Sequence, residues 1–521
     1  MSLRRLGADL IMLATALPVI VHASEQPKRQ PHVGPAWVAA PGPLRVSSDG
    51  RGIVDSEQRS FFYLSDTNWE LFRRASREEA EELLERRRAQ GFTVIFGPVT
   101  GILDALQYDR PLGLPNAYGD LPFVDGDVTR PDLTAGSDPT DAAQYDYWDH
   151  VDAILDIATT KGFHIGLIPA WHTHYTRGVV NAGNARAYGR FLGKRFGGRD
   201  NIFWVLGGDT APAKSWSEKS LLEWTRWIAR SFASTFGRTR VDVGLEVHHE
   251  LAEGIRETEG ARHLMSFHPI GSTSSSRWLH DADWLDFNML QSGHSRRDIA
   301  NYRMIEADYA RRPVKPVIDG ENRYEDHAIG DDHDVSKGWF DDYDNRQAAY
   351  WGVFAGAFGH VYGNRGVWQM LPAGAQPHLP ARYDWRRAVD LPGAAAMLHM
   401  RRLMVSRPLA GRLPDQSLVV DALAGADHIQ ATRGDGFAFV YSAGGQSFEI
   451  VRSKLGFSAI AAWWYDPRTG VADRIGSFNS DDARLVFDPP GGPMRGNDWV
   501  LVLDDQARAF GPPGQAFANR Q

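Results

Sequence analysis

Eight short apolar segments alternate with longer segments of helical periodicity between Phe61 and Asn364, and this alternation constrains the fold more than any other feature. The segments are FFYLSD, FTVIFGPV, HIGLIPAW, IFWVLGGD, HLMSFHPI, LDFNMLQSGH, VKPVIDGE and GHVYGN. Strands that alternate with helices are typical of a parallel sheet, and eight such units favour a closed (β/α)8 TIM barrel. An open α/β sheet is the alternative, but no glycine-rich phosphate-binding motif follows the first strand.

The pattern changes after residue 408. Short alternating runs such as FAFVYS, FEIVRS and DWVLVLDD, separated by Gly, Asp and Pro, predict an antiparallel β-sandwich. The tripeptide Arg433-Gly434-Asp435 lies between two runs, and we interpret it as a hairpin turn. The predicted organisation is a signal peptide over 1–23, a proline-rich lead over 24–45, a catalytic (β/α)8 barrel over 46–408 and a β-sandwich over 409–521.

The first 23 residues predict export to the periplasm or the medium. Arg4 and Arg5 precede the apolar run Leu10–Val21, and small residues follow at a suitable cleavage position. A frayed tail of a cytoplasmic protein is the alternative. No other apolar stretch approaches the length of a membrane span.

The net charge of -8 and the absence of a long basic run argue against nucleic acid as a partner. The chain has no Cys, which excludes thiol nucleophiles and cysteine metal sites.

The carboxyl ends of barrel strands build the active site of such folds, so residues at these positions are the candidates for chemistry. This rule selects Asp66, Trp69, Trp171, His172, His174, Asp209, His268, Gln291, His294, Glu321, Asn364 and Trp368. Two acids, Asp209 and Glu321, end the fourth and seventh strands. A pair of carboxylates is what cleavage of a glycosidic bond requires, one as acid and one as nucleophile or base.

Structural roles for the two acids are the alternative. Asp209 could cap a helix over APAKSWSEKSLLEW, and Glu321 could form a salt bridge with Arg323 or with another arginine of the barrel. Strand alternation in VIDGE predicts that Asp319 lies on the same side as Glu321, but deeper.

The histidines suggest a metal site as a further alternative. His172 and His174 resemble the paired histidines of metal-dependent barrel hydrolases, and His268, His294 and Asp209 could complete a site. That motif typically ends the first strand, whereas here it follows the third. We therefore expect neither a metal nor another cofactor.

Long ordered motifs, among them FFYLSDTNWELF, NIFWVLGGDT, PVKPVIDGENRYED and WYDPRTG, resemble the apiosidase-like glycoside hydrolases of family 140, whose C-terminal module is named a collagen-binding domain. The resemblance extends from Val46 to Asp505. It implies a (β/α)8 barrel with a β-sandwich, and release of side chains from the pectic polysaccharide rhamnogalacturonan II. It also implies that Asp209 is the general acid/base and Glu321 the nucleophile. Barrel glycosidases that retain configuration generally end strand four in Asn-Glu, so the shorter Asp209 must sit on a closer backbone.

The leading hypothesis is therefore an exported retaining glycosidase that acts on a polysaccharide through Asp209 and Glu321. Residues expected to bind the substrate are Asp66, Trp69, Trp171, His172, His268, Gln291, His294, Tyr324, Asn364 and Trp368. Burial and the charge of Glu321 should raise the pKa of Asp209 toward neutrality. A catalytically silent glycan-binding protein and a metal-dependent hydrolase are the alternatives. For the C-terminal domain we expect a packing role beside the barrel.

Overall fold

The computed structural model describes residues 42–103, 114–212, 244–479 and 483–515. The predicted signal peptide, most of the proline-rich lead and the helix predicted over APAKSWSEKSLLEW lie outside these residues. None of the helices in the described ranges is both long and apolar enough to cross a membrane.

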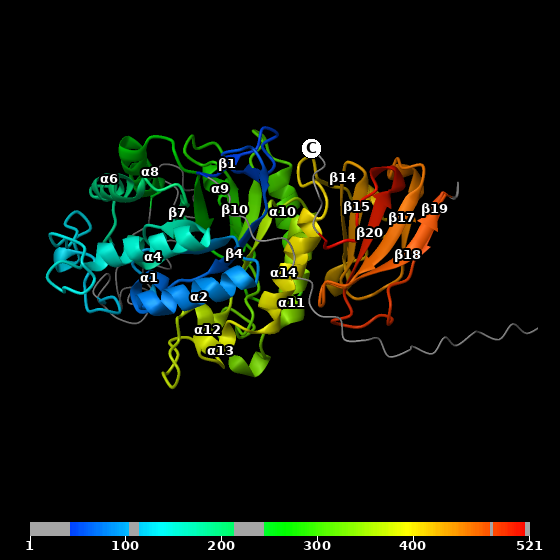
Figure 1. The fold of residues 1–521 in the computed structure, drawn as a ribbon. Helices are drawn as coiled ribbons and strands as arrows, with labels where there is room; N and C mark the ends of the chain where they lie inside the picture. Colours follow the sequence, from blue (N-terminus) through cyan, green and yellow to red (C-terminus); the bar gives the residue numbers. More distant parts are fainter. Residues whose placement is uncertain (1–41, 104–113, 213–243, 480–482, 516–521) are drawn as a thin grey trace, which may run out of the picture. The chain divides into compact units, whose positions relative to one another are not determined.

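All eight predicted strands form, and Figure 1 shows the fold. They are β4 (Tyr63–Thr67), β5 (Val94–Pro98), β6 (His164–Ile168), β7 (Ile202–Thr210), β8 (Met265–Pro269), β10 (Asn288–Gln291), β11 (Val317–Glu321) and β12 (Gly359–Tyr362). Six of them make one parallel sheet in the order β12-β4-β5-β6-β7-β8. β10 and β11 pair in parallel in a second sheet, which the short antiparallel β9 (Thr273–Ser274) extends.

Single backbone hydrogen bonds link the two sheets at both of their junctions. Asp286 N–H donates to the carbonyl of Met265 in β8, and Phe358 N–H donates to that of Val317 in β11. β10 also contacts β8, and β11 contacts β12. The observed architecture is thus a mixed α/β fold in which a six-stranded parallel sheet and a parallel pair adjoin at two places.

Helices lie between the strands in the chain. They are α1 (Leu71–Arg74), α2 (Arg77–Ala89), α4 (Tyr147–Lys161), α5 (His172–Thr176), α6 (Ala185–Phe196), α8 (Leu245–Glu259), α9 (Ser276–Leu279), α10 (Asn301–Tyr309), α11 (Asp342–Phe354), α12 (Arg365–Trp368), α13 (Trp385–Ala388) and α14 (Pro392–Val405). Ser76 caps α2, because its hydroxyl accepts from Glu79 N–H while the Glu79 side chain accepts from Ser76 N–H. The sequence contains this cap as a Ser followed three residues later by a Glu.

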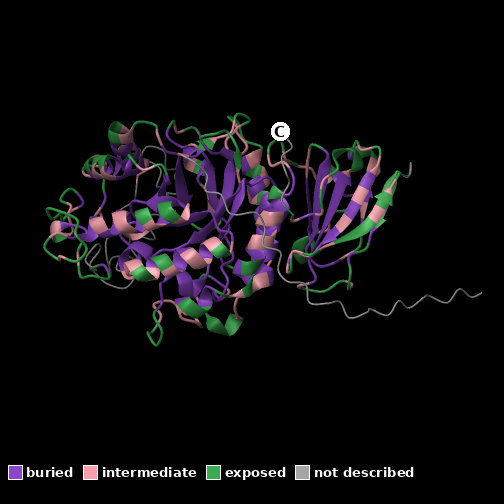
Figure 2. Cartoon of the chain, in the orientation of Figure 1, coloured by how far each residue is buried: buried purple, intermediate pink, exposed green. Residues whose placement is uncertain are grey.

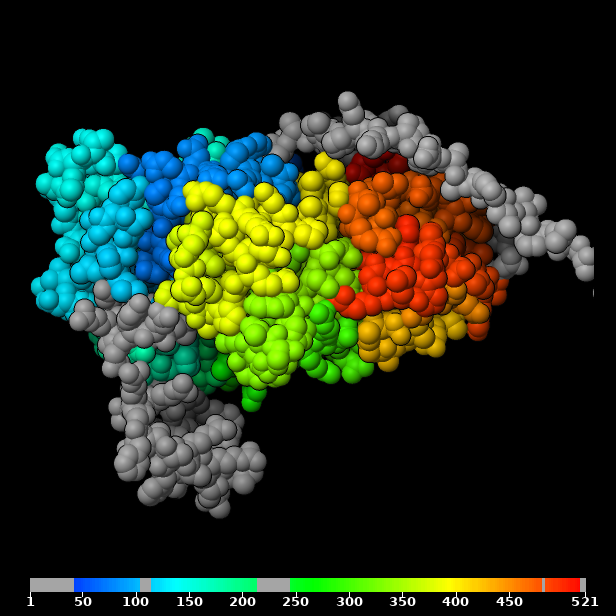
Figure 3. All heavy atoms as spheres, turned by 90° about the horizontal axis from the view of Figure 1, so that it is seen from below, coloured from blue at the N-terminus to red at the C-terminus, as the bar shows by residue number. Residues whose placement is uncertain are grey.

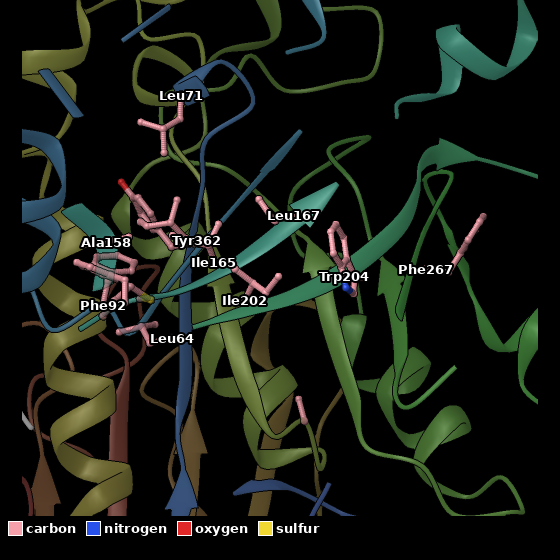
Figure 4. Close-up of a cluster of buried hydrophobic side chains, with 14 of the residues drawn as sticks. Leu64, Leu71, Phe92, Ala158, Ile165, Leu167, Ile202, Trp204, Phe267 and Tyr362 are labelled. Carbon is pink, nitrogen blue, oxygen red and sulfur yellow. The ribbon is translucent and has the colours of Figure 1, made fainter. Parts of the chain in front are cut away.

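Successive residues of the strands enter two separate apolar clusters, as side-chain alternation requires. Leu64 and Trp204 belong to the outer cluster, where Figure 4 labels both. The same cluster includes buried apolar residues of α2, α4, α6 and α8. Their neighbours Tyr63 and Phe203 belong to the inner cluster, which these four helices do not enter. The strands are therefore buried on both faces (Figure 2). A short antiparallel sheet of β1 (Arg45–Val46), β2 (Ile53–Val54) and β3 (Ser60–Phe61) adds Ile53 to the inner cluster.

The C-terminal part consists of antiparallel sheets. Its strands are β13 (Leu413–Pro414), β14 (Ile429–Gly434), β15 (Phe437–Ser442), β16 (Phe448–Val451), β17 (Ile460–Tyr465), β18 (Ala472–Phe478), β19 (Arg484–Phe487) and β20 (Trp499–Asp505). They form a six-stranded sheet, β13-β14-β15-β20-β17-β18, and the pair β16-β19. A third apolar cluster contains residues of both. The tripeptide Arg433 to Asp435 ends β14 and enters the turn to β15, which confirms the predicted hairpin.

Candidate active site

A cavity of about 580 Å³ lies at the carboxyl ends of the parallel strands. Its lining consists of Trp69, Ile102, Trp171, His172, Asp209, Ile270, Gly271, Ser272, Gln291, Gly293, His294, Glu321, Tyr324, His327, Asp331, His333, Arg365, Trp368 and Leu379. This volume is within the usual range of small-molecule sites. Both predicted catalytic acids are part of the lining.

A β-bulge presents Asp209 to the cavity. In the ladder between β7 and β8, Gly207 pairs with His268 and Thr210 with Pro269, so Gly208 and Asp209 are extra residues. Gly207, Gly208 and Asp209 have φ values of 88°, 81° and 50°, in the left-handed region that favours glycine. A Cβ on Gly208 would lie 2.4 Å from the Trp171 ring. The two glycines therefore let the strand turn sharply under a tryptophan and redirect the following acid.

A second irregularity precedes Glu321. Between β10 and β11, Leu290 pairs with Asp319 and Gln291 with Glu321, which leaves Gly320 as an extra residue. The prediction that Asp319 shares a side with Glu321 is therefore wrong, because the extra residue breaks the alternation. Asp319 is buried off the cavity and accepts hydrogen bonds from the Ser292 hydroxyl at 2.7 Å and from Asn301 Nδ2 of α10 at 3.2 Å.

The two acids face each other across His268. One carboxylate oxygen of Asp209 lies within 4.8 Å of one of Glu321. His268 Nδ1 accepts the backbone N–H of Asp209 at 3.3 Å, so this nitrogen carries no proton. His268 Nε2 lies 3.3 Å from Glu321 Oε2. His268 thus contacts the backbone of one acid and the carboxylate of the other.

The environments of the two acids drive their pKa values apart. Burial, followed by the charge of Glu321, raises the pKa of Asp209 to about 7, although 38% of its side chain is exposed at the cavity. Burial alone would also raise the pKa of Glu321, but hydrogen bonds from His268 and His294 outweigh it and lower this pKa to about 2. His294 Nε2 lies 2.9 Å from Glu321 Oε1. Between about pH 2 and about pH 7 the pair therefore holds one proton, on Asp209.

Aromatic rings form much of the cavity wall. The side chains of Trp69, Trp171, Tyr324 and Trp368 are almost fully buried in the protein and reach the cavity with their edges or faces. The Trp69 and Trp171 rings lie 4.9 Å apart between centroids, and each packs against His268. Rings held this firmly suit contact with the apolar face of a sugar.

Seven of the ten residues predicted to bind substrate line the cavity: Trp69, Trp171, His172, Gln291, His294, Tyr324 and Trp368. The other three do not. Asp66 lies within β4, which continues to Thr67, and forms a fully buried ion pair with Arg87 of α2 at 2.8 Å. Asn364 caps α12, since its side-chain oxygen accepts from Gly366 N–H at 3.0 Å. His268 lies fully buried between the acids.

Arg323 does not pair with Glu321, so the salt-bridge alternative is wrong for this acid. The Arg323 side chain is buried and turns toward α11, where its Nε donates to the carbonyl of Asp344 at 3.2 Å. The helix-cap alternative for Asp209 involves residues outside the described part of the chain.

Sequence reasoning missed a buried arginine of the cavity. Arg365 is 2% exposed, and its Nη2 lies 2.9 Å from His333 Nδ1. It directly follows Asn364 at the exit of the eighth strand, so extending the strand-end rule by one residue would have found it. His327, Asp331 and His333 were also missed. They belong to the long connection from β11 to α11, whose path the sequence pattern does not specify.

Asp209, His268 and Glu321 are also the residues that could hold a metal ion. Within the described ranges they form one group of His, Asp and Glu side chains close enough to share an ion, and neither His172 nor His174 belongs to it. His174 is buried off the cavity, with Nδ1 accepting the backbone N–H of Trp171 at 3.0 Å. The paired histidines of the metal hypothesis thus do not join the acid pair.

Two family models match the chain. The model of the apiosidase-like catalytic domain matches residues 47–410. The model described as "Putative collagen-binding domain of a collagenase" matches residues 413–504. The search of curated proteins returned no match.

Solved structures resemble the chain over most of its length. One, described as a glycoside hydrolase, is 33% identical, with 89% of this chain and 97% of the other covered and a TM-score of 0.76. A glycoside hydrolase family 5 structure from Bacteroides vulgatus is also 33% identical, with 90% and 94% covered and a TM-score of 0.77. Another glycoside hydrolase structure from the same organism, at 14% identity and a TM-score of 0.56, shares the fold.

Proposed function

The chain belongs to the family of apiosidase-like catalytic domains and is a glycoside hydrolase, and we propose that it cleaves its substrate with retention of configuration, using Asp209 as acid/base and Glu321 as nucleophile. The observation that supports this most directly is the approach of the two carboxylates to within 4.8 Å. Retaining enzymes hold their carboxyl groups about 5 to 5.5 Å apart, whereas inverting enzymes need about 6.5 to 9.5 Å to admit a water molecule.

In the first step, a Glu321 oxygen attacks the anomeric carbon while the bond from that carbon to the leaving oxygen breaks. Asp209 donates its proton to the leaving oxygen, which departs as a hydroxyl group. The low pKa of Glu321 keeps the nucleophile ionised, and the raised pKa of Asp209 keeps the acid protonated at the same pH. The product of this step is a glycosyl ester of Glu321.

In the second step, ionised Asp209 takes a proton from water as the water oxygen attacks the anomeric carbon. The ester bond breaks, and Glu321 leaves as a carboxylate. The ester removes the negative charge of Glu321, which in the free enzyme helps to raise the pKa of Asp209. Loss of that charge lowers the pKa of Asp209 and converts it from an acid into a base.

The fold of the catalytic part is, in this proposal, a closed (β/α)8 barrel over 46–408, followed by a β-sandwich over 409–521. The separation of inner and outer apolar clusters supports closure, as do the backbone hydrogen bonds at both junctions of the two parallel sheets. The apolar cluster shared by the two antiparallel C-terminal sheets supports the sandwich.

The substrate class proposed is a complex polysaccharide, and rhamnogalacturonan II is the first candidate because the matched family is apiosidase-like. The buried tryptophans of the cavity would contact the sugar ring, and Gln291 and His172 would bind hydroxyl groups. Export to the periplasm or the medium, where such a polymer would be met, remains a prediction from residues 1–23.

Product release from a panel of pectic and furanose-containing glycans tests the proposal. Wild-type protein should release a sugar from at least one of them, and nuclear magnetic resonance should detect first the anomer with the configuration of the substrate. Glu321→Gln should release none. Glu325→Gln is the matched control, since Glu325 is a buried acid of the same segment that contacts Tyr362 and Gly393 instead of the cavity.

Two results would contradict the proposal. Turnover by Glu321→Gln at the wild-type rate would remove the nucleophile assignment, and a first product of opposite anomeric configuration would indicate inversion. Binding to a glycan without release of sugar from any of the panel would instead favour the glycan-binding alternative.

A further inference from the structure

The C-terminal domain contacts the catalytic part through helix α11, and these contacts are polar, buried and directional. Arg346 of α11 donates through Nε and Nη2 to the two oxygens of Asp498, each at 3.0 Å. Both side chains are at most 3% exposed. Trp351 Nε1 donates to the carbonyl of His428 at 2.9 Å, and the Tyr343 hydroxyl to that of Ala443 at 3.1 Å. A partner buried in this way fixes the rotation and position of a helix along its axis.

Aromatic stacking extends the same contact toward the end of the helix. Tyr350 stacks on Tyr441 with centroids 4.9 Å apart, and Phe354 stacks on Phe439 at 5.8 Å. These residues of β15 belong to the outer apolar cluster of the catalytic part. The segment around α11 adjoins the C-terminal sheets in two views of the protein (Figures 1 and 3).

The opposite side of α11 bonds to the chain on both flanks of Glu321. Asn345 Nδ2 donates to the carbonyl of Arg323 at 2.8 Å, and Arg323 Nε returns a bond to the carbonyl of Asp344. Asn301 Nδ2 joins the carbonyl of Ala348 in α11, at 2.9 Å, to the carboxylate of Asp319. Arg323 and Asp319 each lie two residues from Glu321. A shift of α11 would therefore be transmitted to the backbone that carries this acid.

The beginning of α11 is held in the same manner. Arg495, in the C-terminal domain, donates to both oxygens of Asp341 at 2.8 Å, and Asp341 caps the helix. The connection from β11 to this cap contains His327, Asp331 and His333 of the cavity wall. The C-terminal domain thus anchors the far end of the same connection whose near end is Glu321.

We propose that the C-terminal domain is a positioning element of the active site, which acts through the Arg346–Asp498 pair and α11 to hold Glu321 between His268 and His294. Arg346 and Asp498 are positioning residues, since neither contacts the cavity. This assigns to the domain a role other than the collagen binding after which its family is described. The inference rests on the proposed role of Glu321.

Glu321 is held by a 2.9 Å hydrogen bond with His294 Nε2, and His268 Nε2 lies 3.3 Å from its other oxygen. A small displacement of the backbone weakens both contacts, because hydrogen bonds and ion pairs depend steeply on distance and direction. Displacements of about 1 Å remote from the chemistry can reduce turnover about a hundredfold. Ground-state contacts with the buried tryptophans should be spared, because Trp69 and Trp171 pack against each other and His268, remote in the chain from α11. The expected signature is a fall in kcat with little change in KM.

Asp498→Asn in the full-length protein tests the proposal, and Asp504→Asn is its matched control. Asp504 forms an equally buried two-pronged pair with Arg407, at 2.8 and 2.7 Å, but does not touch α11. We expect Asp498→Asn to lower kcat about tenfold to a hundredfold. It should also move the acid limb of the kcat/KM profile to higher pH, because Glu321 loses hydrogen bonds that stabilise its ionised form. Asp504→Asn should lower the melting temperature and leave both quantities unchanged.

Arg495→Gln keeps the test usable if Asp498→Asn does not fold, because Arg495 is half exposed and its loss should give a smaller change in the same direction. Equal changes of kcat and pH profile in the Asp498 and Asp504 variants, or no change in either, would overturn the proposal. Glu321→Gln measured in parallel separates this failure from failure of the proposed function, which would appear as activity retained in that variant.

Discussion

The carboxyl ends of β7 and β11 both contain a β-bulge followed by an acid at the cavity, but the pKa of one acid is raised and that of the other is lowered. Two extra residues at β7, Gly208 and Asp209, and one at β11, Gly320, interrupt the ladder and place an acid in the cavity. At β7, burial and the charge of Glu321 raise the pKa of the acid. At β11, His268 from β8 and His294 from the loop after β10 approach the carboxylate, and its pKa falls.

The difference shows that position at a strand end brings an acid to the cavity, whereas the residues around the acid set its pKa. Asp209 and Glu321 would be interchangeable by the strand-end rule alone. The histidines distinguish the two acids. His294 Nε2 and His268 Nε2 lie 2.9 and 3.3 Å from the oxygens of Glu321, whereas the contact of His268 Nδ1 with Asp209 Oδ1 is longer, at 3.9 Å. This asymmetry supports the proposed division of roles between Asp209 and Glu321.

The largest expected effect separates the two acids by the leaving group. Glu321→Gln should lower kcat/KM about a thousandfold or more for every substrate, since no nucleophile remains. Asp209→Asn should cause a similar loss on natural glycosides, but a much smaller loss in bond cleavage when the leaving group is an acidic phenol that departs without a proton. Steady-state and burst kinetics with an aryl glycoside measure this. Equal losses with both leaving groups would contradict the division of roles.

The next largest effect concerns the two glycines that shape the exits. Gly208→Ala should lower the free energy of unfolding by about 1–3 kcal/mol and reduce turnover, because φ is 81° and the new Cβ would meet the Trp171 ring. Gly320→Ala is the matched comparison. Its Cβ would meet the flexible side chain of Met289, which can move. Denaturant unfolding and kcat of both variants give the comparison, and a greater loss in Gly320→Ala would show that the two bulges do not differ as described.

A smaller effect is expected on the pH profile. Activity requires ionised Glu321 and protonated Asp209, so it should fall as pH rises through about 7 and as pH falls through about 2. His294→Ala removes a donor to ionised Glu321, raises its pKa and should move the acid limb about one unit upward. His294→Gln retains a donor and should restore part of the shift. A kcat/KM profile that is identical in wild type and His294→Ala would remove the role given to this histidine.

The smallest expected effect is that of chelation. Removal of divalent ions should leave kcat/KM unchanged, because Asp209, His268 and Glu321 are assigned to proton transfer, bonding and nucleophilic attack. Activity assays before and after exhaustive dialysis against a chelator measure this. Loss of activity that returns with an added divalent ion would favour the metal-dependent alternative and contradict the proposed roles of Asp209 and Glu321.

The sequence by itself determined the order of strands and helices, the antiparallel C-terminal part and the two strand-end acids that line the cavity. These depend on local signals: apolar alternation, the Ser76 cap, turn residues and acids at strand ends. Seven of the ten predicted substrate-binding residues line the cavity, because they too were selected by their position at or just after a strand end.

Only the tertiary structure decided which side chains at those ends face the cavity. The extra residue at Gly320 separates Asp319 from Glu321, and β4 extends past Asp66, so counting along a strand fails at both places. It also decided the charge state of each acid, the place of Arg365 in the cavity and the bonds from α11 to the C-terminal domain. These features depend on contacts between residues distant in the chain, and a local pattern contains no information about their distance.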